Sequence, residues 1–201
     1  MMDSTATQYL ASKETNKKIL CQFVFDTSAS MAGKPLADLK QGIAQFISLS
    51  KNNSHIHKTF ELGMIVAAGR VHEIQPLIEI EKVTHPALFA CGGAPLGQAM
   101  ALAQHRLYLR KHQLLRKGVT SVASHLILIS DGMPMDNWLT VAAQLKQQAE
   151  LGNISVLAVG LPGSNLHMLS QFSQHPAKSI AFSELTAFFH WLAILLTQKI
   201  K

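Results

Sequence analysis

Two aspartates, Asp26 and Asp131, each directly follow a short apolar run that is typical of a buried strand. Asp26 also opens an alternating Asp-x-Ser-x-Ser segment with Ser28 and Ser30. In a tight loop this alternation directs three oxygen-bearing side chains toward one spot. Such hard oxygen ligands, with few negative charges, suit Mg²⁺, which keeps waters and takes one or two carboxylates. With Asp131 opposite, on a neighbouring strand end, the four residues form a candidate metal site.

Each of these residues also has a simpler interpretation when it is taken alone. A strand-end aspartate often caps a helix or binds loop amides, and the two serines could satisfy the amides of a turn. The combined spacing on two strand ends favours the metal site over these roles.

The elements that must position these residues are strands and helices in alternation. Apolar runs at residues 19–25, 126–130 and 154–159 predict buried strands, and residues 179–182 predict a weak one. The segment 60–80 predicts a hairpin at the sheet edge, where Pro76 is tolerated. Predicted helices start near Leu36, Leu96, Trp138 and Leu166, and after Ser183 as the cap of the last one.

This alternation predicts an α/β fold with three layers, in which a doubly wound, mostly parallel sheet carries one antiparallel edge strand. In such sheets ligands bind outside the carboxyl ends of the central strands. Two further signals concern helix ends: Asp136 or Asn137 is expected to cap the helix at Trp138, and Gly118 to end the long helix before it.

Composition fits one globular domain. The chain has 201 residues, of which 48% are hydrophobic, and its net charge is +6. We expect a polar arm at residues 1–17 and a single domain at residues 18–201. The start of the chain lacks the apolar core of a signal peptide, and the two cysteines suit a reducing compartment, so a cytoplasmic location is expected.

Three segments make the sequence recognisable: FVFDTSASMAGKP at residues 23–35, CGGAPLGQAM at 91–100 and LILISDGMPMDNW at 126–138. In order and spacing they resemble the three blocks of a von Willebrand factor A (vWA) domain, from about Lys18 to the terminal helix. The hairpin and the ending FFHWLAILL are most similar to the bacterial tellurium-resistance TerY-type branch. The resemblance implies a Rossmann-like vWA fold.

The resemblance also implies a metal-ion-dependent adhesion site (MIDAS). Asp26, Ser28 and Ser30 would be its Asp-x-Ser-x-Ser ligands, and Asp131 its second aspartate, which usually reaches the metal through water. The family's threonine ligand is replaced here by Ala94, which has no oxygen to offer. The implied cofactor is Mg²⁺, with Mn²⁺ or Ca²⁺ as alternatives, and the missing ligand predicts weak or absent binding.

The function that this resemblance implies is non-catalytic: a protein–protein interaction module whose partner supplies an acidic side chain to the metal. The surface that meets the partner would be a rim formed by Met31, Gly93, Ala94 and Met133, since methionines in loops give an adaptable apolar surface. The TerY-type likeness implies a bacterial stress or metal-resistance system, in which relatives are encoded beside protein kinases and phosphatases.

Two alternatives stay open, and enzymes are disfavoured. The site could be vestigial and the domain a metal-independent scaffold, or the basic helix at residues 106–117, whose outer side is expected to carry Arg106, Arg110, Arg116 and Lys117, could bind nucleic acid. Gly33-Lys34 lacks the flanking residues of a phosphate-binding loop, and Ser28 stands where a phosphatase of this topology needs aspartate. Cys91, beside the missing ligand, is interpreted as a packing residue.

Overall fold

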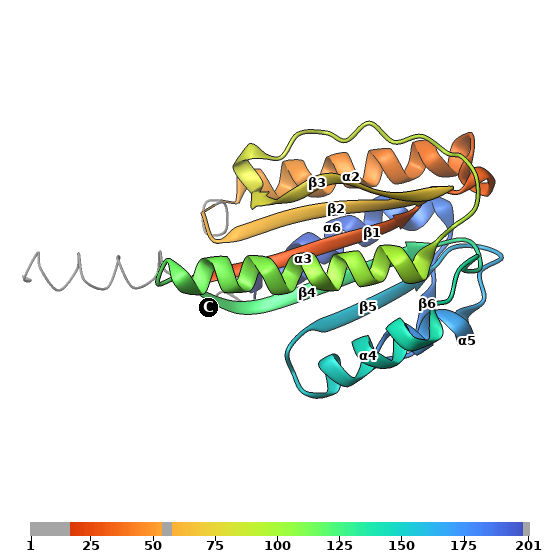
Figure 1. Ribbon diagram of the computed structural model, residues 1–201. Coiled ribbons are helices and arrows are strands. Elements are labelled where there is room, and N and C mark those ends of the chain that lie inside the picture. Colours follow the sequence, from red (N-terminus) through yellow and green to blue (C-terminus); the bar gives the residue numbers. More distant parts are fainter. Residues whose placement is uncertain (1–16, 54–57, 199–201) are drawn as a thin grey trace, which may run out of the picture.

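One six-stranded sheet organises the chain, in the order β3-β2-β1-β4-β5-β6 (Figure 1). The computed structural model describes residues 17–53 and 58–198, so the predicted N-terminal arm lies, apart from Lys17, outside the described residues. Neighbouring strands are parallel except for β2 and β3, which form the predicted antiparallel edge hairpin. The strands are β1 (Lys17–Asp26), β2 (Phe60–Ala68), β3 (Arg70–Glu79), β4 (Thr120–Ser130), β5 (Ser155–Gly160) and β6 (Lys178–Ser179).

Helices cover both faces of this sheet, which confirms the predicted three-layer fold (Figure 1). One face carries α2 (Lys34–Asn52) and α6 (Leu185–Gln198). The other carries α3 (Leu96–Arg116), α4 (Leu139–Glu150) and the short α5 (Leu166–Leu169). Single 3₁₀ turns lie at Ala29–Met31, Ile80–Lys82, Ser170–Phe172 and Phe182–Glu184. Within the described part of the chain no helix has the length and apolar character needed to cross a membrane.

Strand β1 lies in the middle of the sheet, between β2 and β4. Both neighbours are parallel to it, and helices cover both of its faces. All of its residues except Lys17 are buried. Successive side chains point to opposite faces of a strand, so Phe23 and Phe25 reach the α2/α6 layer, where they contact Phe46 and Phe189. The near-continuous apolar run that predicted this strand is therefore explained by burial on two sides.

Three element boundaries differ from those expected. β4 starts at Thr120 and not at residue 126, because its polar first half pairs with the start of β1. β6 consists of Lys178 and Ser179 alone. Ser183 does not cap the terminal helix: it lies inside the 3₁₀ turn before α6, where the Ala181 N–H donates to the Glu184 carboxylate at 2.8 Å.

Helix α3 is capped from a distant segment. The Asp136 carboxylate accepts hydrogen bonds from the N–H groups of Gly97 (3.0 Å) and Gln98 (2.7 Å), so it stabilises α3, and the expectation that it caps the following helix is wrong. A negative charge is favourable at a helix N-terminus because the first N–H groups have no partner within the helix. The predicted end at Gly118 is confirmed: its φ of +72° permits the reversal of the chain.

A cluster of charged residues is buried at the end of the sheet where β1 and β2 begin. The Glu61 carboxylate has no exposed surface and accepts two hydrogen bonds from the Arg110 guanidinium of α3, at 2.6 and 2.7 Å. Lys18 Nζ lies 2.9 Å from Glu79 Oε1 and 4.0 Å from Glu61 Oε1. Hydrogen bonds from Lys82 and Lys18 lower the pKa of Glu79 to about 2. These pairs join α3 to the edge hairpin.

Replacing Arg110 tests this cluster. Arg110→Ala leaves the buried Glu61 carboxylate with Lys18 alone, 4.0 Å away. Removing one partner of a buried ion pair costs about 3–5 kcal/mol, and the remaining lysine places the expected loss near 3 kcal/mol in the free energy of unfolding. Urea denaturation measures it. Lys34→Ala breaks an exposed pair with Asp38 and should change the same quantity by less than about 1 kcal/mol. Equal effects of the two substitutions would contradict the conclusion that Arg110 stabilises the fold by pairing with the buried Glu61 carboxylate.

Candidate functional site

The candidate site lies at the carboxyl edge of the sheet, where β1 and β4 end side by side (Figure 1). Asp26 is the last residue of β1, and Asp131 directly follows β4. The parallel register, in which Phe25 is paired with Ile129, carries both aspartates to the same end of the sheet. The sequence-based expectation that the two strand ends are neighbours is therefore confirmed.

Asp26 is fully buried and both of its carboxylate oxygens accept hydrogen bonds. Oδ1 accepts from the Ser28 N–H at 2.9 Å, and Oδ2 accepts from the Ser130 hydroxyl at 2.6 Å. The first bond closes the loop that follows β1, and the second links β1 to β4. Asp26 thus holds the site together structurally, whatever it binds.

The two motif serines face each other across the loop. Their hydroxyl oxygens are 3.0 Å apart; Ser28 is buried and Ser30 is exposed. Thr27, between Asp26 and Ser28 in the chain, has a fully buried hydroxyl without a hydrogen-bond partner among the described residues. The serine pair therefore offers two hydroxyl oxygens at the boundary with solvent, in the loop that directly follows Asp26.

Asp131 has an unusual environment. Partial burial raises the pKa of its carboxyl group; a hydrogen bond from Ser30 opposes that rise, and the negative charge of Asp26 adds to it. Its buried Oδ1 has no hydrogen-bond partner among the described residues. Neither Asp26 nor Asp131 forms an ion pair in the part of the chain that the structure describes.

This donor set fits a hard divalent cation. Two carboxylates that form no ion pair with a described residue, one unpartnered carboxylate oxygen and two hydroxyls leave negative potential that a cation would neutralise. Among the described residues there is no group of three or more His, Cys, Asp or Glu side chains that could hold a metal ion. The site that the sequence predicts is of another kind, since it combines two carboxylates with hydroxyl oxygens.

The loop that carries the replaced threonine is tied to the motif loop by backbone hydrogen bonds. The Cys91 N–H donates to the Thr27 carbonyl at 3.1 Å, and the Ala29 N–H donates to the Gly92 carbonyl at 2.9 Å. Cys91 itself is exposed, so the interpretation of this thiol as a packing residue is wrong. Backbone hydrogen bonds fix the loop, and the Cys91 thiol adds one to the Ala68 carbonyl at 3.6 Å.

The same loop is held by the edge hairpin and by the loop after β4. The Gly69 N–H donates to the Gly93 carbonyl at 2.7 Å, and the Met135 N–H donates to the Ala94 carbonyl at 3.0 Å. A Cβ atom on Gly92 would lie 2.5 Å from the Gly69 Cα, and Gly69 itself has a φ of +67°, so both positions favour glycine. Ala94 is therefore placed at the site by contacts on two sides.

Two residues of the predicted rim are buried. Met31 has no exposed surface, because the 3₁₀ turn at Ala29–Met31 directs it into the core between α2 and α6. Ala94 is 2% exposed, and its methyl group joins the apolar cluster under α3. The expectation that these two side chains lie on the surface is wrong. Gly93 is partly exposed and Met133 is 60% exposed, so their role at the rim stays a prediction.

Other apolar side chains are exposed beside the site. Met135, whose side chain lies against Gly93, is 78% exposed, and Phe89 is 74% exposed two residues before Cys91. Together with Met133, these two side chains form the exposed apolar part of the rim. Phe89 lies in a segment without helix or strand. The segment has no apolar periodicity, and this was the one signal in the sequence that Phe89 could be exposed.

The basic helix at residues 106–117 is partly neutralised. Arg106 Nη2 lies 2.8 Å from Glu73 Oε2 on β3, and Arg110 is bound to Glu61. Both arginines therefore bind the hairpin, although the sequence places them on the outer side of the helix. The nucleic-acid alternative loses two of the charges on which it depends.

The matching family model is the von Willebrand factor type A domain, and it covers residues 22–189. The chain therefore belongs to the von Willebrand factor type A domain family, whose domains generally mediate protein–protein interactions. The three sequence segments that predicted this membership are the ones that form the site edge. The assignment to the TerY-type branch is a separate prediction.

Solved structures have the same fold at low sequence identity. The vWF domain of the type V pili tip protein Mfa5 from Porphyromonas gingivalis has a TM-score of 0.68 at 12% identity, over 92% of this chain and 96% of that one. Proximal thread matrix protein 1 from the mussel byssus, with a zinc-occupied MIDAS motif, has a TM-score of 0.64 at 16% identity, over 91% of this chain and 46% of that one. The pilus adhesin SpaC from Lactobacillus rhamnosus GG, in an open conformation, has a TM-score of 0.73 at 11% identity, over 91% and 30%. No curated protein matches the chain in sequence.

The hydrogen bond between Ser130 and Asp26 can be tested by stability. Ser130→Ala removes the hydroxyl that donates to Asp26 Oδ2 in a fully buried position. Hydrogen bonds to charged groups contribute about 1.5–3 kcal/mol, so the free energy of unfolding should fall by that amount in urea denaturation. Ser48→Ala, at an exposed position of α2, serves as the control and should cause no loss. A Ser130→Ala variant as stable as the parent would disprove the anchoring role of this bond.

Proposed function

We propose that this domain is a non-catalytic protein–protein interaction module that binds a partner through a MIDAS-type Mg²⁺ site at the Asp26 edge. The observation that carries the proposal is the set of oxygen atoms gathered there, whose two carboxylates form no ion pair with any residue that the structure describes. The orphaned Asp131 Oδ1 lies beside the hydroxyl-bearing motif loop. A divalent cation would supply the missing positive charge.

The residues that would hold the ion are Ser28 and Ser30 through their hydroxyls and Asp26 and Asp131 through their carboxylates. When bound, Mg²⁺ keeps coordination positions for water or for a carboxylate of a partner protein. Mn²⁺ and Ca²⁺ are alternatives with the same preference for oxygen. Ala94 leaves one ligand position to water, so we expect binding weaker than in a site that has the threonine.

The apolar side chains around the oxygen atoms would extend the contact. Phe89, Met133 and Met135 are exposed on the rim of the site. Methionine and aromatic side chains are enriched at protein interfaces because they bury large area and adapt in shape. A partner that presents an acidic side chain next to apolar ones would match both features.

The biological setting is proposed from the TerY-type likeness alone. It places the domain in the bacterial cytoplasm, in a stress or metal-resistance system linked to phosphorylation, with a protein kinase or phosphatase as partner. The residues of the site contain nothing that selects tellurite over another stress.

A second candidate is a metal-independent scaffold with a vestigial site. Two observations favour it: Ala94 is an apolar residue packed into the core, and both oxygens of Asp26 already accept hydrogen bonds from the protein. In this case the rim alone would contact the partner. Metal titration separates the two candidates.

Thermal unfolding with EDTA or with excess Mg²⁺ or Mn²⁺ tests the metal site. Ligand at about 100 times its dissociation constant adds about 2.7 kcal/mol, which for a chain of this length raises the unfolding midpoint by about 5–10 °C. The shift should be lost in a Ser28→Ala/Ser30→Ala double variant. These serines are better controls than Asp26, because Asp26 also joins β1 to β4.

A further variant tests the role of the missing threonine. Ala94→Thr restores a hydroxyl at this position and should increase the midpoint shift at a fixed Mn²⁺ concentration. The outcome that favours the vestigial site is no shift for the parent chain and none for Ala94→Thr.

Affinity capture tests the interaction itself. The immobilised chain should retain a specific protein from an extract of the source organism in Mg²⁺, and at least tenfold less of it in EDTA. The Ser28→Ala/Ser30→Ala variant should behave in Mg²⁺ as the parent does in EDTA. Met133→Glu, which places a charge on the rim, should also reduce capture. Retention that is equal in both buffers and in the double variant would rule out metal-dependent binding.

A further inference from the structure

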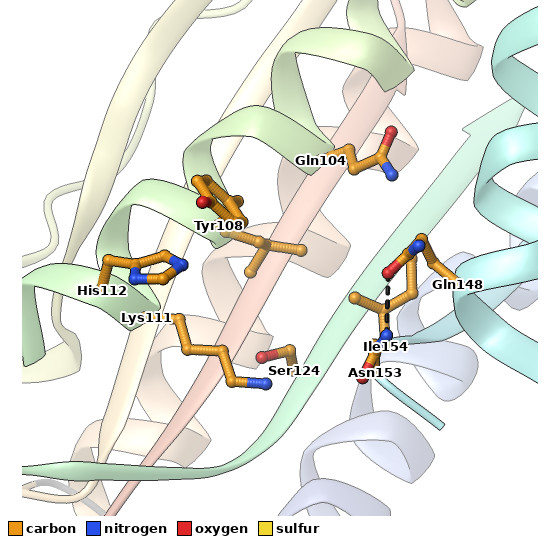
Figure 2. A pocket seen from close by; sticks show the side chains of 9 residues that line it. Gln104, Tyr108, Lys111, His112, Ser124, Gln148, Asn153 and Ile154 are labelled. Atoms are coloured by element: carbon orange, nitrogen blue, oxygen red, sulfur yellow. Dashed lines mark hydrogen bonds between the residues drawn. The ribbon is translucent and has the colours of Figure 1, made fainter. Parts of the chain in front are cut away.

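A cavity of about 260 Å³ lies far from the candidate metal site, between the second half of α3 and the end of α4 (Figure 2). Lys111 and Tyr108 of α3 form one wall, Gln148 and Asn153 stand opposite, and Ser124 of β4 lies between them. Ser124 is six residues before the end of β4, which corresponds to about 20 Å along a strand. The cavity is therefore separate from the Asp26 edge.

An adjoining cavity of about 310 Å³ shares four of the lining residues with the first, namely Lys111, Ser124, Asn153 and Ile154. It lies beside the first half of β4, where β5 does not reach: the pairing of these strands begins only at His125 and Ser155. The two cavities thus form one continuous recess. The first is slightly below, and the second just within, the volume range of about 300–1,000 Å³ of small-molecule sites.

The charge of this recess favours an anion. No aspartate or glutamate is among the described residues that line either cavity. Lys111 contributes a positive charge, and it forms no ion pair with any described residue. This contrasts with Arg106 and Arg110 on the same helix, whose charges are bound by glutamates of the hairpin.

The rest of the lining is suited to an organic molecule. Leu107 is buried and Ile154 half-buried, and both border the first cavity. The rings of Tyr108 and His112 lie 4.2 Å apart and close one side. Asn153 donates to Gln148 Oε1 at 2.9 Å, which fixes two amide groups across from the lysine (Figure 2). Apolar surface with a few convergent polar groups is typical of small-molecule sites.

We infer that this recess binds a small organic anion, whose acidic group lies beside Lys111 and whose apolar part contacts Leu107 and Ile154. The inference is independent of the metal site. Its ligand is defined by one carboxylate or phosphate group joined to a compact apolar body of about the size of an aromatic ring.

Titration of the ¹⁵N-labelled full chain by NMR, in EDTA, tests the inference. The probes are phenyl phosphate and benzoate, with inorganic phosphate and phenol as the charge-only and apolar-only arms. At least one aromatic anion should shift the amide signals of Ser124 and Asn153, and it should bind at least tenfold more tightly than either partial probe. Which of the two binds identifies the acidic group. Failure of both anions, or equal binding by inorganic phosphate, would overturn the inference.

Two lysine variants locate the charge contact. Lys111→Gln should weaken binding of the aromatic anion about tenfold or more, as expected for loss of a charged hydrogen-bond partner. Lys117→Gln removes the same charge one residue beyond the end of α3, outside the lining of both cavities, and should leave the affinity within twofold. Equal weakening by both variants would show a general charge effect and contradict the assigned contact.

Discussion

The hydrogen bond from the Ser130 hydroxyl to the Asp26 carboxylate holds together the edge of the sheet on which the candidate site depends. It connects the ends of β1 and β4 where no backbone ladder continues. The same carboxylate fixes the Ser28 N–H and with it the turn of the motif loop. Asp26, which the sequence predicts as a metal ligand, therefore also has a structural role. This double role explains how the loop can keep its shape when Ala94 removes one ligand.

Charge is distributed unequally between the two ends of the sheet. At the amino end, Glu61 is buried but satisfied by Arg110 and approached by Lys18, so the charges there stabilise the attachment of α3 to the hairpin. At the carboxyl end, burial raises the pKa of Asp131 and the charge of Asp26 adds to the rise, and no described basic residue forms an ion pair with either aspartate. The first arrangement is complete within the chain. In the function that we propose, a cation, or a partner that carries one, balances the second.

Much of the fold could be predicted from the sequence because its signals are local. Continuous apolar runs mark the central strands, and their aspartate ends lie together because the strands are parallel neighbours. What was missed depends on contacts between distant segments. The burial of Met31 follows from packing of a single turn into the apolar cluster that α2 and α6 form. Asp136 caps α3 from a position 39 residues after Gly97 in the chain. Helical spacing placed Arg106 on an outer face, but the hairpin glutamates cover that side.

The close contact between Gly69 and Gly92 limits where the chain can gain or lose residues. Gly69 forms the one-residue connection between β2 and β3, and its N–H supports the loop before α3. An insertion in this turn would push against Gly92 and displace the loop, so the hairpin cannot grow outward at this end. The segment between β3 and Phe89 is not restrained in this way by the site. Insertions in this half of the chain are therefore expected in the exposed stretch between the buried Val83 and Leu88, whereas a change of hairpin length would displace the loop that carries Ala94.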